Sequence, residues 1–369
     1  MTMTHPFPRE LSLPLFVFIM AGGSGERFWP LSRQRTPKHL LRLFSDQTLL
    51  EQTVQRFEGI VPPEQIFILT NEAQWESTCK VLPEHPMENI IAEPAKRDTA
   101  AAATLATAIA LRHHSEAIVG LFPADAMIHH TALFQIQLME AALMAATTSA
   151  LITFSIKPTY PAISFGYLDL GEKIFTSSNV QTAFHQVNSF VEKPPLIRAK
   201  EFVASAHHGW NAGMFLWKGT AFLKECQRQE PAFATFAQEL LKSPLVATCL
   251  LEKFSQLPKV SLDYAIMEKA ERVIAAVALF DWDDVGRWTA LPAHLGVDAH
   301  GNTIKAPSNA LLLHHSSNNI VFIDHSSQKT IALCGVKDLI VVETSDALLI
   351  CHRDDAEQIK SLSLPENLR

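Results

Sequence analysis

Short apolar runs alternate with helical patterns through the first two thirds of the chain. Runs of branched and aromatic residues predict buried strands, namely the run that ends at Ala21, 66–70 and 119–122. Between them, Thr48 and Glu51 form a capping-box pattern before a predicted helix over 49–57, and an alanine-rich segment predicts another over 99–112. This alternation predicts an α/β domain with a Rossmann-like, mixed but mostly parallel sheet that helices cover on its faces.

The alternation continues and then changes near the end of the chain. Strands are predicted over 90–92, 150–156, 187–191 and 273–280, and helices over 133–144, 220–227 and 262–270. From about Gly301 onward, short apolar strands follow one another at close spacing, over 310–313, 320–323, 330–333, 339–342 and 347–351. That spacing predicts a small all-β domain. We therefore predict one domain over residues 13–295 and a second over 296–369.

Composition narrows the class of protein. At 369 residues the chain is long enough for two domains. With 47% hydrophobic and 19% charged residues it has an ordinary globular balance. A formal net charge of −7 argues against a nucleic-acid surface. The chain is therefore predicted to have no nucleic-acid partner.

Cysteine and histidine usage favours a cytoplasmic protein without a histidine metal site. The five cysteines are scattered, odd in number and never spaced as C-x-x-C, as expected for reduced thiols in the cytoplasm. Histidines often occur as adjacent pairs, whose side chains point in different directions. The apolar run over 11–21 is too short to span a bilayer, and its upstream charges, Arg9 and Glu10, cancel. Residues 1–12 are predicted to be a loose leader, and no membrane partner is expected.

A glycine loop follows the first predicted strand. Gly22, Gly23 and Gly25 allow the backbone to approach a ligand closely, and Arg27 and Lys38 add positive charge. This combination suits a phosphate chain, although neither the Walker pattern nor the dinucleotide pattern G-x-G-x-x-G is present. A plain glycine turn with solvated basic residues is the alternative interpretation.

Carboxylates follow two of the predicted strands. Asp125 comes after the strand over 119–122, where open α/β sheets bind ligands, so it is a candidate Mg²⁺ ligand or a cap for the next helix. Asp281, Asp283 and Asp284 repel one another and call for a nearby cation, unless they form an acidic surface turn. Asp98 or Thr99 is a candidate cap of the helix over 99–112, and this helix start is also a candidate ligand contact.

Seven segments in order resemble the sugar-1-phosphate nucleotidylyltransferases. Gly22 to Ser32 followed by Pro37-Lys38 is similar to the signature G-G-x-G-x-R…P-K, and the W-P-L-S continuation resembles the mannose-1-phosphate guanylyltransferase branch. Six further segments resemble family elements. They are E-P-x-x-R-N-T at 93–99, P-A-D at 123–125, F-V-E-K-P at 190–194, W-N-S/A-G-M-F at 210–215, S-I-D-Y-A-V-M-E-K at 261–269 and W-S-D-V-G-S-W at 282–288. The chain departs from this pattern at Asp98, which replaces an asparagine, and at Asp283 and Arg287, which replace serines.

The resemblance implies roles for individual residues. Arg27, Lys38, Lys193 and Asp284 would be catalytic, and Asp125 and Asp284 would bind Mg²⁺, the implied cofactor. The sugar would be bound by Gly166, Glu192, Lys193 and Asn211. The nucleotide would be bound by Ala21, Gly22, Gly23, Gly25, Arg27, Lys38, Glu93, Asp98 and Thr99. No chemistry is assigned to Asp263, whose place in the first turn of a helix explains an acidic residue.

The implied reaction transfers GMP from GTP to α-D-mannose 1-phosphate, giving GDP-mannose and pyrophosphate. The resemblance also implies a short left-handed β-helix for the second domain, which would serve packing or oligomerisation, with a homodimer as one assembly. The chain is expected to lack the additional isomerase domain of bifunctional relatives. Two alternatives stay open: a nucleotidylyltransferase for another sugar 1-phosphate, such as a manno-heptose, or for another nucleotide, and a catalytically silent nucleotide-sugar sensor on the same fold.

Overall fold

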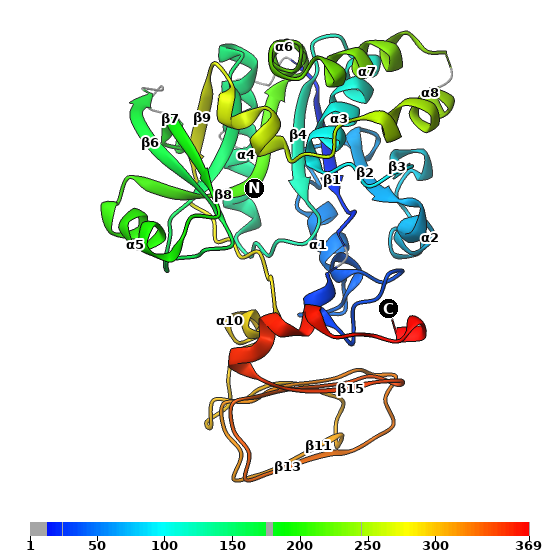
Figure 1. Cartoon of the computed structure of the whole chain (residues 1–369), viewed down its shortest axis with the longest axis vertical. Helices are drawn as coiled ribbons and strands as arrows, with labels where there is room; N and C mark the ends of the chain where they lie inside the picture. Colours follow the sequence, from blue (N-terminus) through cyan, green and yellow to red (C-terminus); the bar gives the residue numbers. More distant parts are fainter. Residues whose placement is uncertain (1–12, 24, 175–179, 245, 369) are drawn as a thin grey trace, which may run out of the picture.

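The computed structural model describes residues 13–23, 25–174, 180–244 and 246–368, so the predicted leader and Ser24 lie outside it. A large α/β unit stands above a small coiled β unit (Figure 1). In the described part, the α/β unit is built on a nine-stranded sheet in the order β3-β2-β1-β4-β8-β5-β9-β7-β6. Its strands are β1 (Leu15–Met20), β2 (Ile66–Asn71), β3 (Ile90–Glu93), β4 (Ile118–Pro123), β5 (Leu151–Ile156), β6 (Gly166–Ile174), β7 (Phe184–Glu192), β8 (His208–Lys218) and β9 (Val273–Val277).

The sheet is mixed, as predicted, but parallel pairing does not predominate. Strands β3, β2, β1 and β4 are parallel, and so are β5 and β9. Strand β8 runs antiparallel to β4, β5 and β6, and β7 runs antiparallel to β9 and β6. The long antiparallel strands of the middle segment were not distinguishable from parallel ones, because periodicity along one strand does not reveal the direction of its neighbour.

Helices cover both faces of the sheet because each strand alternates its side chains. In β1, Leu15, Val17 and Ile19 pack into one hydrophobic core, whereas Phe16 and Phe18 pack into the other. The helices are α1 (Leu49–Gln55), α2 (Glu72–Val81), α3 (Thr99–His113), α4 (Thr131–Thr148), α5 (Leu196–Ser205), α6 (Gly219–Gln229), α7 (Pro231–Lys242), α8 (Val246–Lys253), α9 (Leu262–Ala265) and α10 (Leu291–Leu295). None of the helices in the described ranges is long and apolar enough to cross a membrane.

Most predicted elements are present, and some end earlier than predicted, such as the helix expected over 49–57, which is α1. The helix expected over 262–270 is only α9, because Ile266 adopts φ −128° and ψ −54° and a 3-10 turn, Met267–Lys269, follows it. The strand expected over 273–280 ends at Val277. Helix α1 begins with the predicted capping box, in which Glu51 N donates to Thr48 Oγ1 at 3.1 Å and Thr48 N donates to Glu51 Oε2 at 2.7 Å.

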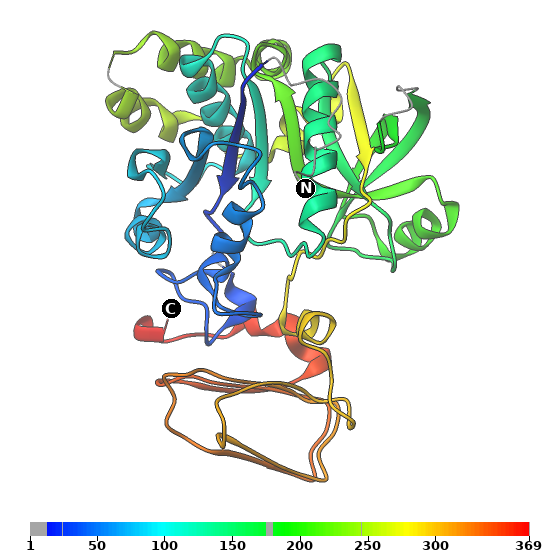
Figure 2. The same cartoon turned by 180° about the vertical axis from the view of Figure 1, so that it is seen from behind.

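The small unit is a β-helix-like coil, seen below the sheet in both views (Figure 2). All five predicted strands are present as β11 (Leu311–His314), β12 (Ile320–Ile323), β13 (Ile331–Cys334), β14 (Leu339–Glu343) and β15 (Leu348–His352), and β10 (Thr303–Lys305) was missed. Successive turns stack in parallel as β10-β12-β14 and β11-β13, and β15 closes the coil antiparallel to β14. The chain then forms a 3-10 helix, η8 (Arg353–Ser361), which returns toward the α/β unit.

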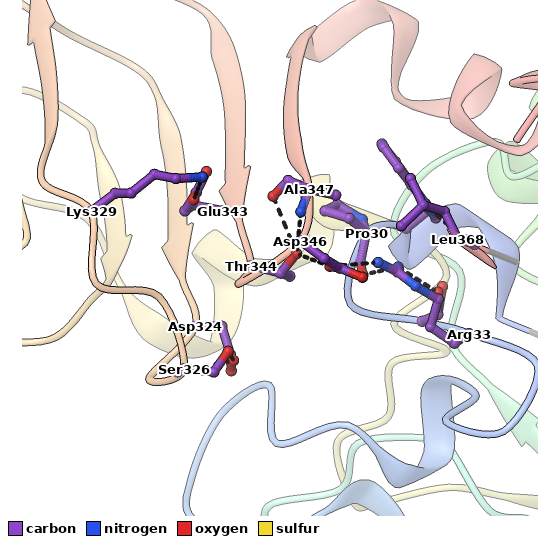
Figure 3. A network of polar contacts seen from close by, with 12 residues as sticks. Pro30, Arg33, Asp324, Ser326, Lys329, Glu343, Thr344, Asp346, Ala347 and Leu368 are labelled. Carbon is purple, nitrogen blue, oxygen red and sulfur yellow. Dashed lines mark hydrogen bonds and ion pairs between the residues drawn. The ribbon is translucent and has the colours of Figure 1, made fainter. Parts of the chain in front are cut away.

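The two units share a core and polar contacts. Phe28 and Trp288 of the α/β unit belong to the same hydrophobic cluster as Phe322 of the coil. Figure 3 shows the polar part, in which Arg33 Nη2 lies 3.1 Å from Asp346 Oδ1. Thr344 Oγ1 in turn donates to Asp346 at 2.8 Å. The coil is therefore packed against the segment that follows the glycine loop.

Candidate functional site

Three chain segments meet at one edge of the sheet. Strands β1 and β4 are parallel neighbours with Met20 opposite Pro123, so the glycine loop and Asp125 leave the sheet side by side. The third segment carries Asp284. Met127 N donates to Asp283 O at 2.8 Å and Asp283 N donates to Met127 O at 3.0 Å, which holds that segment against the one that follows Asp125.

Three of the four predicted catalytic residues, Arg27, Lys38 and Asp284, line a common cavity of about 320 Å³, whereas Lys193 does not line it. Lys38 is buried, and its Nζ lies 3.0 Å from Asp125 Oδ2 and also donates to the backbone oxygen of Asp284. Arg27 Nη1 donates to Gly286 O at 3.4 Å. The cavity is lined by Gly25, Glu26, Arg27, Phe28, Lys38, Asp125, Asp284, Gly286 and Lys360. The structure therefore brings Arg27 and Lys38, the candidate cations for the triphosphate, together with both candidate metal ligands.

The two candidate metal ligands of this cavity, Asp125 and Asp284, repel each other. Burial raises the pKa of Asp284, and the positive charge of Lys38 opposes this shift, whereas the neighbouring carboxylate of Asp125 adds to it. A positive ion between Asp125 and Asp284 would relieve that repulsion. Among the described residues, no group of three or more His, Cys, Asp or Glu side chains could hold a metal by itself. Two carboxylates still fit Mg²⁺, because this ion is often held by one or two carboxylates together with substrate phosphates.

The glycine loop is shaped by contact with Lys38. Gly25 has φ +64°, and a Cβ placed on it would lie 2.5 Å from Lys38 Cβ and 2.6 Å from Lys38 N. Gly22 and Gly23 have open space at the same position. Only glycine fits at Gly25, since both its backbone conformation and the space beside it exclude a side chain.

The loop is also held from outside by a residue that the sequence did not indicate. Gln74, buried in α2, donates from Nε2 to Gly23 O and to Gln34 O, both at 3.3 Å. Ala21 is buried and held by β2, since its N donates to Leu69 O at 2.7 Å and Thr70 Oγ1 donates to its O at 3.0 Å. The sequence gives no signal for Gln74, because a glutamine in a helix is an ordinary surface residue.

Gly25→Ala is expected to lower the free energy of unfolding by about 1–3 kcal/mol, because it combines backbone strain with a clash against Lys38. Gly22→Ala is the matched control, since its Cβ would meet no atom within 4 Å. Urea unfolding of both variants and the unchanged protein tests this. Equal midpoints for the two variants would contradict the assigned geometry.

A second polar cluster contains the candidate sugar-binding residues. Gly166 pairs with Glu192 between β6 and β7, and a Cβ on Gly166 would lie 2.5 Å from Glu192 Oε2 and 3.6 Å from Asn211 Cβ. Lys193, at φ +46°, donates from Nζ to Glu192 Oε1 at 2.7 Å. The four predicted residues therefore lie together, and the missing side chain at Gly166 leaves room for Glu192.

Asp263 joins this cluster, although no chemistry was predicted for it. Asn211 Nδ2 donates to Asp263 Oδ1 at 2.8 Å, and Thr153 Oγ1 donates to Asn211 Oδ1 at 2.9 Å, so both ends of the amide are fixed. Burial raises the pKa of Asp263 to about 6, and the charge of Glu192 contributes in the same direction. The sequence signal for Asp263 was an acidic residue within the S-L-D-Y segment. Its place in the first turn of a helix already explained an acidic residue there, so no chemistry was predicted for it.

Aromatic rings connect the two clusters. Phe165, next to Gly166, has its ring centre 5.4 Å from that of Trp282 and 5.2 Å from that of Trp210. Trp282 lies two positions before Asp284, and Trp210 precedes Asn211. The sugar-site candidates and the metal-site candidates are therefore neighbours across a packed aromatic bridge.

The remaining candidate nucleotide contacts lie around β3 and the start of α3. Asp98 caps α3, since Thr99 N donates to its Oδ1 at 2.8 Å, and Thr99 Oγ1 accepts from Leu262 N at 2.8 Å. The capping role of Asp98 is thus confirmed, whereas ligand contact by Asp98 or Thr99 stays a prediction. Burial raises the pKa of Glu93 to about 8, so this carboxyl is largely protonated at neutral pH and can donate as well as accept.

The residues that replace family serines have partners of their own. Asp283 Oδ1 accepts from Val285 N at 2.7 Å, and its Oδ2 lies 3.1 Å from His294 Nε2. Arg287 Nη1 lies 3.3 Å from Glu357 Oε1. Asp283 therefore stabilises the turn before Asp284, and Arg287 contacts the 3-10 helix η8.

Asp125 is not a helix cap, because α4 begins after His130.

Comparison with known proteins agrees with this geometry. Residues 17–295 match the family described as nucleotidyl transferase, and residues 314–363 match the MannoseP isomerase/GMP-like beta-helix domain. The chain is 32% identical to a mannose-1-phosphate guanylyltransferase of Escherichia coli, over 94% of this chain and 72% of that one. It is 31% identical to the alginate biosynthesis protein AlgA of Pseudomonas aeruginosa, over 93% of this chain and 70% of the relative.

A solved structure shares the architecture of both units. It is described as a mannose-1-phosphate geranyltransferase from Thermus thermophilus, and it superposes with a TM-score of 0.83 at 30% identity. The match covers 95% of this chain and 98% of that one. The chain therefore belongs to the nucleotidyl transferase family, among its mannose-1-phosphate guanylyltransferases.

Proposed function

We propose that this enzyme transfers GMP from GTP to α-D-mannose 1-phosphate and releases pyrophosphate. One observation carries the proposal: Arg27, Lys38, Asp125 and Asp284 line one cavity, and the polar cluster around Asn211 lies next to it. A cavity with this charge pattern suits a triphosphate, and the neighbouring amide and carboxylate suit sugar hydroxyls. The choice of mannose and guanine rests on the names of the relatives.

The reaction needs positioning and charge neutralisation more than proton transfer. An oxygen of the sugar phosphate is already anionic, so it can attack the α-phosphorus in line, forming one P–O bond as the bond to pyrophosphate breaks. Backbone N–H groups of Gly22, Gly23 and Gly25 would hold phosphate oxygens. Arg27 and Lys38 would neutralise their charge. Mg²⁺ bound to Asp125 and Asp284 would supply further positive charge to the phosphate oxygens.

The sugar phosphate would be oriented by the second cluster. Lys193 would leave Glu192 for the phosphate of mannose 1-phosphate, and Glu192 and Asn211 would bind the hexose hydroxyls, with Gly166 leaving space for the ring. Asp263 acts through Asn211, since their 2.8 Å hydrogen bond fixes which end of the amide faces the sugar. Glu93, Asp98 and Thr99 remain proposed contacts of the nucleotide, beyond the glycine loop.

We further propose a cytoplasmic enzyme whose domains are 13–295 and 296–369. The five cysteines are all free, which supports a reducing compartment. A homodimer and a left-handed winding of the β-helix remain part of the same proposal.

The proposed function is tested by pyrophosphate release from purified protein with Mg²⁺ and mannose 1-phosphate. GTP is expected to react at least ~100-fold faster than ATP, CTP or UTP, and glucose 1-phosphate is expected to replace mannose 1-phosphate poorly. Preference for another pair would keep the chemistry and change the substrates. Binding of GTP without turnover of any pair would overturn the proposal in favour of a sensor.

A further inference from the structure

The C-terminal 3-10 helix η8 lies against the glycine loop. Its Ala356 and Ile359 are buried in the hydrophobic cluster that includes Phe28, two residues beyond the loop's Glu26. Side chains three apart eclipse one another in a 3-10 helix. Ala356 and Ile359 face the core, so Glu357 and Lys360 share the adjacent face of the helix. The packing of η8 turns this face toward the cavity that Arg27 and Lys38 line.

Glu357 forms an ion pair with Arg27. Its Oε2 lies 3.0 Å from Arg27 Nε and its Oε1 lies 3.3 Å from Arg287 Nη1. The Arg27 contact is an ion pair without hydrogen-bond geometry, because the buried Nε–H has no hydrogen-bond partner in the described part of the chain. Both side chains are about two-fifths exposed, at 38% and 42%, so the pair is weak and easily exchanged.

Lys360 is the cation of this cavity that no described carboxylate neutralises. Lys38 is paired with Asp125 and Arg27 is paired with Glu357, whereas Lys360 lines the same cavity without an ion pair to the described residues. A triphosphate carries more negative charge than two paired cations can balance. The exposed ammonium group of Lys360 can move to a phosphate at little cost, since it has no partner to leave.

We propose that η8 completes the triphosphate site: Lys360 binds the pyrophosphate end of the nucleotide, and Glu357 occupies Arg27 until phosphate displaces it. This inference rests on the proposed function only in that a pyrophosphate is released from this cavity, and it does not depend on the base or the sugar. It assigns to the β-helix unit a direct part in substrate binding. The two residues act in opposite directions, since one attracts the phosphate and the other competes with it.

The test uses the full-length protein and inorganic pyrophosphate with Mg²⁺, measured by isothermal titration calorimetry. Lys360→Gln is expected to weaken pyrophosphate binding about tenfold, a loss typical of one charge-assisted contact. Lys360→Arg is expected to keep the affinity within about threefold, because the charge remains. Glu357→Gln is expected to tighten binding by about two- to threefold, because the competing carboxylate is neutralised.

Gln358→Ala is the matched control, since Gln358 is exposed on the same helix and does not line the cavity. It should leave the dissociation constant unchanged within twofold. A purely structural role of η8 would weaken binding in both the Lys360→Gln and Glu357→Gln variants, and that result would overturn the proposal, as would unchanged affinity in both. Failure of the proposed function appears separately, as turnover with another nucleotide or sugar while the opposite shifts in pyrophosphate affinity persist.

Discussion

Asp284→Asn is expected to lower kcat/KM for pyrophosphate release by at least about a thousandfold while the protein stays folded. The substitution removes the charge of a candidate metal ligand but keeps its shape. Lys38 is held by the backbone oxygen of Asp284, so its position should survive the change. Stopped-time pyrophosphate assays over a range of Mg²⁺ concentrations, with a thermal melt of the same sample, measure both effects.

Asp354→Asn supplies the control for Asp284→Asn. Asp354 lies on η8, and its side chain is 90% exposed. Its substitution by asparagine therefore removes the same charge without changing the cavity. Its kcat/KM should equal that of the unchanged protein within about twofold. If Asp284→Asn retained more than a tenth of the activity at saturating Mg²⁺, Asp284 would not be an essential metal ligand.

Lys38→Met is expected to lower kcat/KM for pyrophosphate release by at least about a thousandfold and also to lower the free energy of unfolding. Lys38 is buried between Asp125 and the Asp284 backbone, so its loss leaves neighbouring carboxylates uncompensated and removes a cation from the proposed triphosphate site. A methionine keeps much of the volume of the lysine stem, which limits the packing loss. Single-turnover assays and urea unfolding separate the chemical effect from the effect on stability.

Lys80→Met is the matched control for Lys38→Met, because Lys80 makes an exposed ion pair with Glu76 and lies outside the site. Its activity and stability should be nearly unchanged. Retention of the activity by Lys38→Met within tenfold would show that Lys38 serves folding and not catalysis.

Local sequence was sufficient wherever near neighbours decide the structure. The capping box of Thr48 and Glu51, the cap at Asp98 and the short strands of the coil are all present, because each depends on residues within a few positions. Relying on near neighbours also explains why the helix predicted over 262–270 was too long. The helical pattern was real, but the conformation of Ile266 ends the α-helix after four residues.

The candidate site was predictable residue by residue through its resemblance to a family, but its geometry was not. Lys38 and Asp284 are 246 positions apart, and no pattern along the chain gives the contact between them. Asp263 was passed over because a local explanation was at hand, whereas its hydrogen bond to Asn211 spans 52 positions. Gln74 and Glu357 gave no signal, since each is an ordinary polar residue until the fold places it against the glycine loop.

The sequence alone determined the fold class and the division into an α/β segment and a segment of short strands, and its residue types indicated candidates for phosphate binding. These features depend on periodicity, turn residues and residue type, which are properties of the chain. Tertiary structure decided that Gly25 packs on Lys38, that Asp125 and Asp284 face one cavity, and that η8 brings Lys360 to this cavity and Glu357 to Arg27. The physical reason is that ion pairs and close packing act over a few ångströms in space, whatever distance separates the residues along the chain.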